Sequence, residues 1–78
     1  MMATTAKMIG REWTQITDGT QTTMIQITGS ADVCDSPVKP EEDQPSLSFS
    51  NTELTITPPT ALWIRASWFT GNVHVAIL

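Results

Sequence analysis

The sequence has little cysteine, histidine and positive charge, and each shortage excludes a class of protein. Cys34 is the one cysteine, so an internal disulfide cannot form, and Cys34 with His74 cannot supply the four ligands of a structural zinc site. Four Lys and Arg residues are scattered over a chain of net charge −4, which argues against the contiguous basic surface that nucleic acid requires. No apolar run has the length of a signal peptide or a membrane span, so we expect synthesis in the cytoplasm and no membrane partner.

The chain is also short. A domain of 78 residues buries only about 60% of the surface that its unfolded chain exposes, which leaves a marginal core. Because disulfides and a structural metal are excluded, oligomerisation or attachment to a larger assembly is the remaining source of stability. We therefore expect a homo-oligomer, with a trimer favoured, or a domain that its partner stabilises.

The composition favours strands over helices. Thirteen threonines accompany abundant Ile and Val, few Ala, Lys or Glu, and no long apolar stripe of helical period. Residues 1–11 are mostly small, polar and unpatterned, and we interpret them as a flexible N-terminal arm. Residues 12–78 are predicted to form a single β domain.

The first half of this domain carries two strand signals. Glu12–Ile16 is a short candidate strand that the Asp18-Gly19 turn closes. Apolar residues then alternate from Ile25 to Val33, and the same parity continues across Gly29. Alternation held across a glycine predicts a bent or bulged strand.

A proline-rich acidic loop separates these strands from the next pair. Three prolines in residues 35–45 prevent a regular ladder, so this segment is predicted to be an exposed loop. Short alternating strands are expected over residues 47–49 and 54–56, with a turn at Asn51-Thr52 between them.

The strongest alternation lies at the C-terminus. Residues 62–68 and 73–77 alternate on either side of a turn at residues 70–72, which predicts a C-terminal hairpin. About six short strands in all indicate an all-β fold, either a compact antiparallel β-sandwich or a partly open β-barrel.

No group of residues predicts catalysis, a metal site or a cofactor. Asp32 and Asp35 flank Cys34, but neighbouring carboxylates raise the pKa of a thiol and weaken it as a nucleophile. We interpret Cys34 as a small apolar side chain near a strand end. The acidic run at residues 41–43 lacks the spacing of a calcium loop and is predicted to be solvated.

The aromatic residues offer the candidate protein interface. Trp68 continues the apolar parity of the last third of the chain and is predicted to fill the core. Trp63 and Arg65 lie on the opposite face, where they form either an interface pair or an intramolecular stack. Trp13 and His74 complete the candidate interface residues, with His74 pointing to solvent or to a neighbouring subunit.

Four segments carry a resemblance to a known class of proteins. Trp13–Thr20, Gln26–Gly29, Cys34–Ser36 and Thr57–Arg65 resemble segments of small virion proteins of tailed bacteriophages, and the likeness extends over Trp13–Leu78. It rests on strand and turn residues and implies a structural component of the particle, located in the virion.

The resemblance and composition together suggest a non-catalytic protein that binds the outside of the capsid as a decoration, or cement, protein. Its partner would be the major capsid protein or another virion protein. Three alternatives stay open. The first is a protein attached to the tail or its fibres, and the second is a small carbohydrate-binding module that uses Trp13 or Trp63 as a stacking platform. The third is a small enzyme or inhibitor, for which the proline-rich loop is the one candidate site in the sequence.

Overall fold

The computed structural model describes residues 4–68 and 71–78, and these residues form six strands and no helix. The strands are β1 (Thr5–Ile9), β2 (Thr14–Gln15), β3 (Thr23–Asp35), β4 (Leu47–Ile56), β5 (Leu62–Ala66) and β6 (Val73–Ile77). Among these residues, accordingly, no helix is long and apolar enough to cross a membrane.

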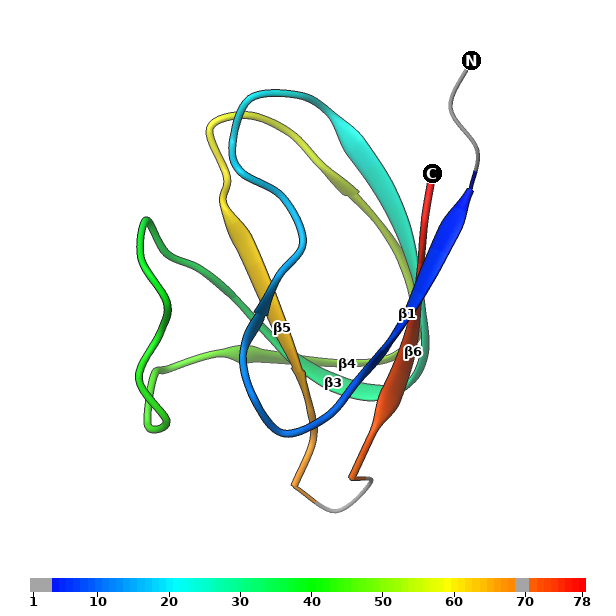
Figure 1. Ribbon diagram of the computed structural model, residues 1–78, viewed down its shortest axis with the longest axis vertical. Coiled ribbons are helices and arrows are strands. Elements are labelled where there is room, and N and C mark those ends of the chain that lie inside the picture. Colours follow the sequence, from blue (N-terminus) through cyan, green and yellow to red (C-terminus); the bar gives the residue numbers. More distant parts are fainter. Residues whose placement is uncertain (1–3, 69–70) are drawn as a thin grey trace.

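All strand pairs are antiparallel and belong to one sheet organised around β3. One edge of β3 pairs with β4, whereas the other edge pairs first with β6 and then with β5. β1 lies outside β6, and β2 lies outside β5. The sheet curls into a half-barrel (Figure 1), which confirms the predicted all-β class in its partly open barrel form.

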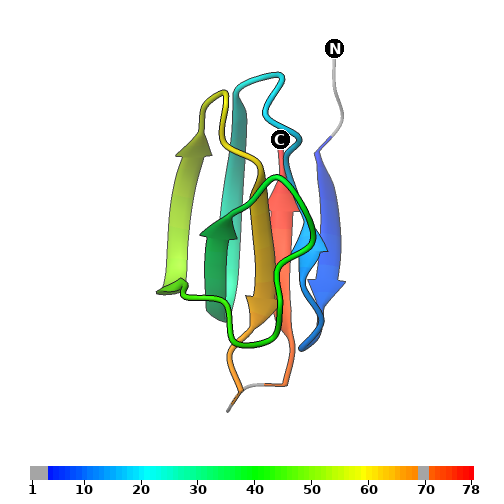
Figure 2. The same cartoon turned by 90° about the vertical axis from the view of Figure 1, so that its left-hand side faces the viewer.

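The curl divides the sheet into two halves. We call β1, β6 and residues 25–28 of β3 the β6 half, and β2, β5 and residues 31–35 of β3 the β5 half. β4 runs along both halves as an outer strand (Figure 2).

The bend between the halves lies at Gly29, as the alternation across this glycine predicts. The β3–β4 register shifts between Ile27 and Ser30, and Gly29 has a φ of 106° that favours glycine. Asn51 lies opposite with a φ of 48°, and its Oδ1 accepts a hydrogen bond from the Gly29 N–H at 3.0 Å. The predicted turn at Asn51-Thr52 is therefore wrong: β4 is continuous, and Asn51 is the single residue of β4 that lies opposite the bulge formed by Thr28 and Gly29 of β3.

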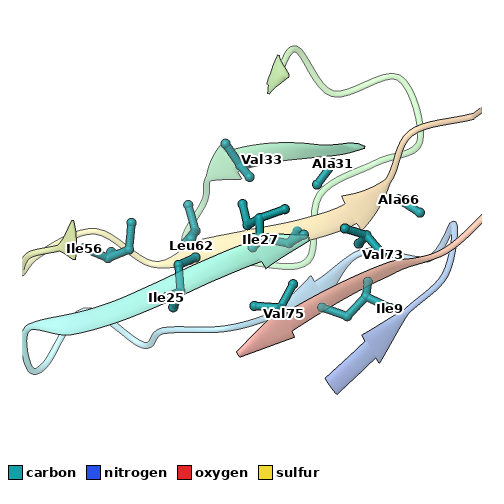
Figure 3. Close-up of a cluster of buried hydrophobic side chains, with 11 residues drawn as sticks. Ile9, Ile25, Ile27, Ala31, Val33, Ile56, Leu62, Ala66, Val73 and Val75 are labelled. Atoms are coloured by element: carbon teal, nitrogen blue, oxygen red, sulfur yellow. The ribbon is translucent and has the colours of Figure 1, made fainter. Parts of the chain in front are cut away.

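The core fills the concave side of the curl (Figure 3). Its members come from every strand except the two-residue β2 and are the alternating apolar residues: Ile9, Ile25, Ile27, Ala31, Val33, Ile56, Leu62, Ile64, Ala66, Val73 and Val75. The predicted parity of the C-terminal strands is confirmed up to Ala66. The segment between Asp35 and Leu47 is a loop, as its prolines predict.

Two predictions about the chain ends need correction. Thr5–Ile9, assigned to the flexible arm, pairs with β6 over its whole length, and Ile9 is buried in the core. Residues 1–3 of the arm lie outside the described residues. β1 shows only one buried apolar side chain, so the alternation that marks a strand was too weak to detect.

The predicted C-terminal hairpin is also wrong. β5 and β6 do not pair in the described part of the chain, because β3 is long enough to pair with both along one edge. Thr70, in the predicted turn, lies outside the described residues. Trp68, expected in the core, is 80% exposed because the β5 ladder ends at Ala66 and the alternation no longer fixes which way the side chain points.

Candidate interaction surfaces

The outer face of the β5 half is covered by the proline-rich loop. We call residues 36–46 the covering loop, which passes in front of β5 in Figure 2. Three side chains donate hydrogen bonds to its backbone carbonyls: Trp63 Nε1 to Ser36 at 2.9 Å, Trp13 Nε1 to Glu41 at 2.9 Å, and Arg65 Nη1 to Glu42 at 2.7 Å. Three of the four candidate interface residues therefore hold a loop of their own chain.

Arg65 is the most buried charge of this face, with 8% of its surface exposed. Its Nε lies 3.3 Å from Asp32 Oδ2, and its guanidinium carbon lies 4.4 Å from the centre of the Trp13 ring. A carboxylate and an aromatic face thus both compensate the desolvated cation. The sequence predicts that Arg65 forms either an interface pair or an intramolecular stack with Trp63. The structure shows an intramolecular stack, but the aromatic partner of Arg65 is Trp13 rather than Trp63.

Asp32 connects this cluster to the edge of the sheet. Its Oδ1 accepts a hydrogen bond from Ser48 Oγ on β4 at 3.2 Å, and Arg11 Nη1 lies 3.9 Å from Oδ2. Arg11 also donates to the carbonyl of Ala66 at the end of β5. The polar side chains here join β3, β4 and β5 to the segment that precedes β2.

Two hollows flank the covering loop. A cavity of about 410 Å³ lies beside Arg65, Trp13 and Pro40, and the ion pair between Glu12 and Lys39 forms part of its wall. The hydrogen bond and charge of Lys39 lower the pKa of Glu12. The cavity walls therefore carry both signs of charge.

A second cavity, of about 440 Å³, has Cys34 in its wall with Val33, Pro45 and Leu47. Cys34 is buried and free. Burial is the largest cause that raises the pKa of its thiol; Arg65 acts in the opposite direction, and Asp35 adds a smaller rise. The predicted direction is confirmed, although desolvation contributes more than the neighbouring carboxylate. A thiol of raised pKa is a poor nucleophile at neutral pH.

The outer face of the β6 half differs because no segment among the described residues covers its apolar side chains. The β1–β6 register places Met8 beside His74. Leu78 lies beside Met24, because its N–H donates a hydrogen bond to the Met24 carbonyl and so extends the pairing of β6 with β3. Met8 is 66% exposed, Met24 48% and Leu78 64%. We call Met8, Met24, His74 and Leu78 the exposed face.

The sequence-predicted interface residues therefore separate into two groups. Trp13, Trp63 and Arg65 come together beneath the covering loop, where Trp13 is only 5% exposed. His74 lies apart on the exposed face, opposite the buried Val73 and Val75, as its parity predicts. The sequence does not single out Met8 and Leu78, because Met8 falls in the predicted arm and Leu78 follows the last predicted strand.

Among residues 4–68 and 71–78, no three His, Cys, Asp or Glu side chains gather in a way that could hold a metal ion. Comparison of the chain with models of protein families, with curated proteins and with solved structures finds no match.

Proposed function

We propose that this protein is a non-catalytic structural component of a bacteriophage particle that binds the outside of the capsid as a decoration protein. The resemblance of its strand and turn segments to small virion proteins supports this proposal. The observation that carries it is the exposed face, where Met8, Met24 and Leu78 remain in water although the opposite side of the same strands carries buried core residues.

An apolar surface of this kind is expected to bind a protein partner. Each Å² of apolar area removed from water contributes about 25 cal/mol, and clustered exposed apolar side chains commonly mark interaction sites. Methionine side chains adapt to a partner of irregular shape because they have three rotatable bonds. His74 adds a polar group beside Met8 that can orient the contact.

Capsid attachment can be tested by sedimentation with separated heads and tails of the particle whose genome encodes the chain. The native protein should sediment with heads. Met8→Glu should weaken that binding about 30-fold, which corresponds to about 2 kcal/mol for an apolar anchor at an interface. Val38→Glu is the matched control, because Val38 is 68% exposed but lies in the covering loop.

Both variants should retain the circular dichroism of the native protein. Native sedimentation with tails alone would support the tail-associated alternative instead. The proposal is overturned if the native protein sediments with neither fraction, or if Met8→Glu binds heads as tightly as Val38→Glu.

A further inference from the structure

The outer edge of β4 has no strand partner among the described residues. β4 pairs with β3 along one side through nine of its ten residues, and its other side forms an outer edge of the molecule (Figure 2). The unpaired N–H and C=O groups of such an edge form a template for another strand.

β1, the outer strand of the β6 half, is protected against such pairing, but β4 is not. β1 has five residues, and Lys7 lies opposite the buried Val75, so a charge stands on the core-facing side of that edge. Short length and inward charge are devices that keep an edge unpaired. β4 has twice the length, no Lys, Arg or Pro, and a single charge at Glu53.

The core is also incompletely covered along β4. Leu47, Phe49 and Leu54 lie opposite the buried Val33, Ala31 and Ile25 respectively, so they share the core-facing side. Leu47 is nevertheless 66% exposed, and Phe49 and Leu54 are only half-buried. A further strand along this edge would cover the three side chains.

We propose that β4 pairs with β4 of a second copy of this chain, antiparallel about a two-fold axis that passes between Asn51 and Thr52. Opposite residues would then have numbers that sum to 103. The core-facing pairs become Leu47 with Ile56 and Phe49 with Leu54, and the outward pairs become Ser48 with Thr55 and Ser50 with Glu53.

Three properties indicate that β4 of a second copy matches the free edge of β4. Each of these four pairs joins side chains of the same face, because β4 reverses its parity at Asn51, next to the centre of the pairing. Both strands bend at the same point, so their curvatures agree. Glu53 meets Ser50 rather than another Glu53, which avoids a like-charge pair. The two-fold register favours a dimer over the trimer expected from the sequence.

This inference does not depend on attachment to a particle, so it can be tested on the free protein. Sedimentation equilibrium should give twice the 8.5 kDa chain mass at high concentration. Leu47→Lys places a charge on the core-facing side of the edge and should raise the dimer dissociation constant at least about tenfold. Val38→Lys, at an equally exposed apolar residue outside β4, should leave it unchanged.

Register can be tested separately by cross-linking in a Cys34→Ala background. The double variant Ser48→Cys, Thr55→Cys should form a disulfide-linked dimer on mild oxidation, because antiparallel neighbours have Cβ atoms about 5 Å apart. Within one chain these positions are about 23 Å apart along the strand, too far for an internal disulfide. Ser48→Cys, Glu53→Cys places no thiols opposite one another and is the control.

A native protein that remains monomeric at millimolar concentration overturns the proposal. Equal cross-linking of the two double variants, or equal dimerisation of Leu47→Lys and Val38→Lys, overturns it as well.

Discussion

The outer faces of the two halves of the sheet differ in their exposure: a loop covers the face of the β5 half, whereas large apolar side chains of the β6 half face solvent. On the β5 half, the covering loop lies over Trp13, Trp63 and Arg65, and the donor groups of all three side chains are used within the chain. On the β6 half, Met8, Met24 and Leu78 face solvent. Aromatic and arginine side chains, which are typical of interfaces, here make contacts within the chain, whereas the large side chains left exposed are methionine and leucine.

The difference shows that residue type does not by itself identify an interaction surface. Trp and Arg have long side chains with directed N–H donors, so they can reach and satisfy the carbonyls of a loop that has no ladder of its own. Methionine has no donor and can gain only by burial. Mutations of the side chains that hold the covering loop should therefore lower the free energy of unfolding, whereas mutations on the exposed face should weaken binding to a partner.

The largest effect should follow loss of Trp13. Trp13→Ala empties a buried aromatic site, removes the hydrogen bond to the covering loop and exposes Arg65, so it should lower the free energy of unfolding by about 3–5 kcal/mol. Trp68→Ala is the matched control, because its 80% exposed side chain should change stability by about 0.5 kcal/mol at most. Urea denaturation compares the two, and equal losses would contradict the burial of Trp13.

A somewhat smaller effect should follow loss of Arg65. Arg65→Met leaves the Asp32 carboxylate without its nearest cation, which should cost about 3 kcal/mol. Arg11→Met removes the more exposed cation, 3.9 Å from the same carboxylate, and should cost less than about 1 kcal/mol. Hydrogen exchange of the covering loop should increase only in Arg65→Met. A cost for Arg11→Met as large as that for Arg65→Met would mean that Asp32 depends on both cations equally.

The sequence predicted the parts of this molecule that follow from local alternation. The core parity from Ile25 to Val33, the bend at Gly29 and the proline-rich loop all depend on neighbouring residues, and the structure confirms them. Trp68 shows the limit of that reasoning, because parity has no meaning beyond the last ladder residue.

The rest depended on contacts between distant segments. β1 is a strand because β6 offers it an edge, and β5 and β6 stay apart because β3 is long enough to pair with both. Arg65 stacks on Trp13 rather than on Trp63, its near neighbour in the sequence, because the β2–β5 register, continued by one residue, places Trp13 opposite Arg65. The sequence therefore predicts that Trp13, Trp63 and Arg65 make contacts, but it does not predict that residues 36–46 of the same chain are what they bind.

The smallest predicted effect is on the pH dependence of stability, and it tests whether the covering loop shields Cys34 from solvent. Its thiol lies on the outward side of β3, opposite Trp63, and burial raises its pKa above the ordinary value of 9.0. The unfolded chain then loses the thiol proton at a lower pH than the folded chain. The contribution of Cys34 to stability is thus fully present below about pH 9 and is lost as the pH rises from there through the folded-state pKa.

Urea denaturation of the native protein and of Cys34→Ala at pH 7.5 and pH 10 isolates this contribution, because the difference cancels the titration of the lysines. The native protein should lose more stability than Cys34→Ala over this interval. Alkylation of the thiol at pH 8 should be slow in the native protein and faster in Trp13→Ala, where the covering loop has lost one of the three hydrogen bonds that it accepts from Trp and Arg side chains. The loop does not shield Cys34 if the stability of the native protein and of Cys34→Ala changes equally with pH, and if the thiol is alkylated equally fast in the native protein and in Trp13→Ala.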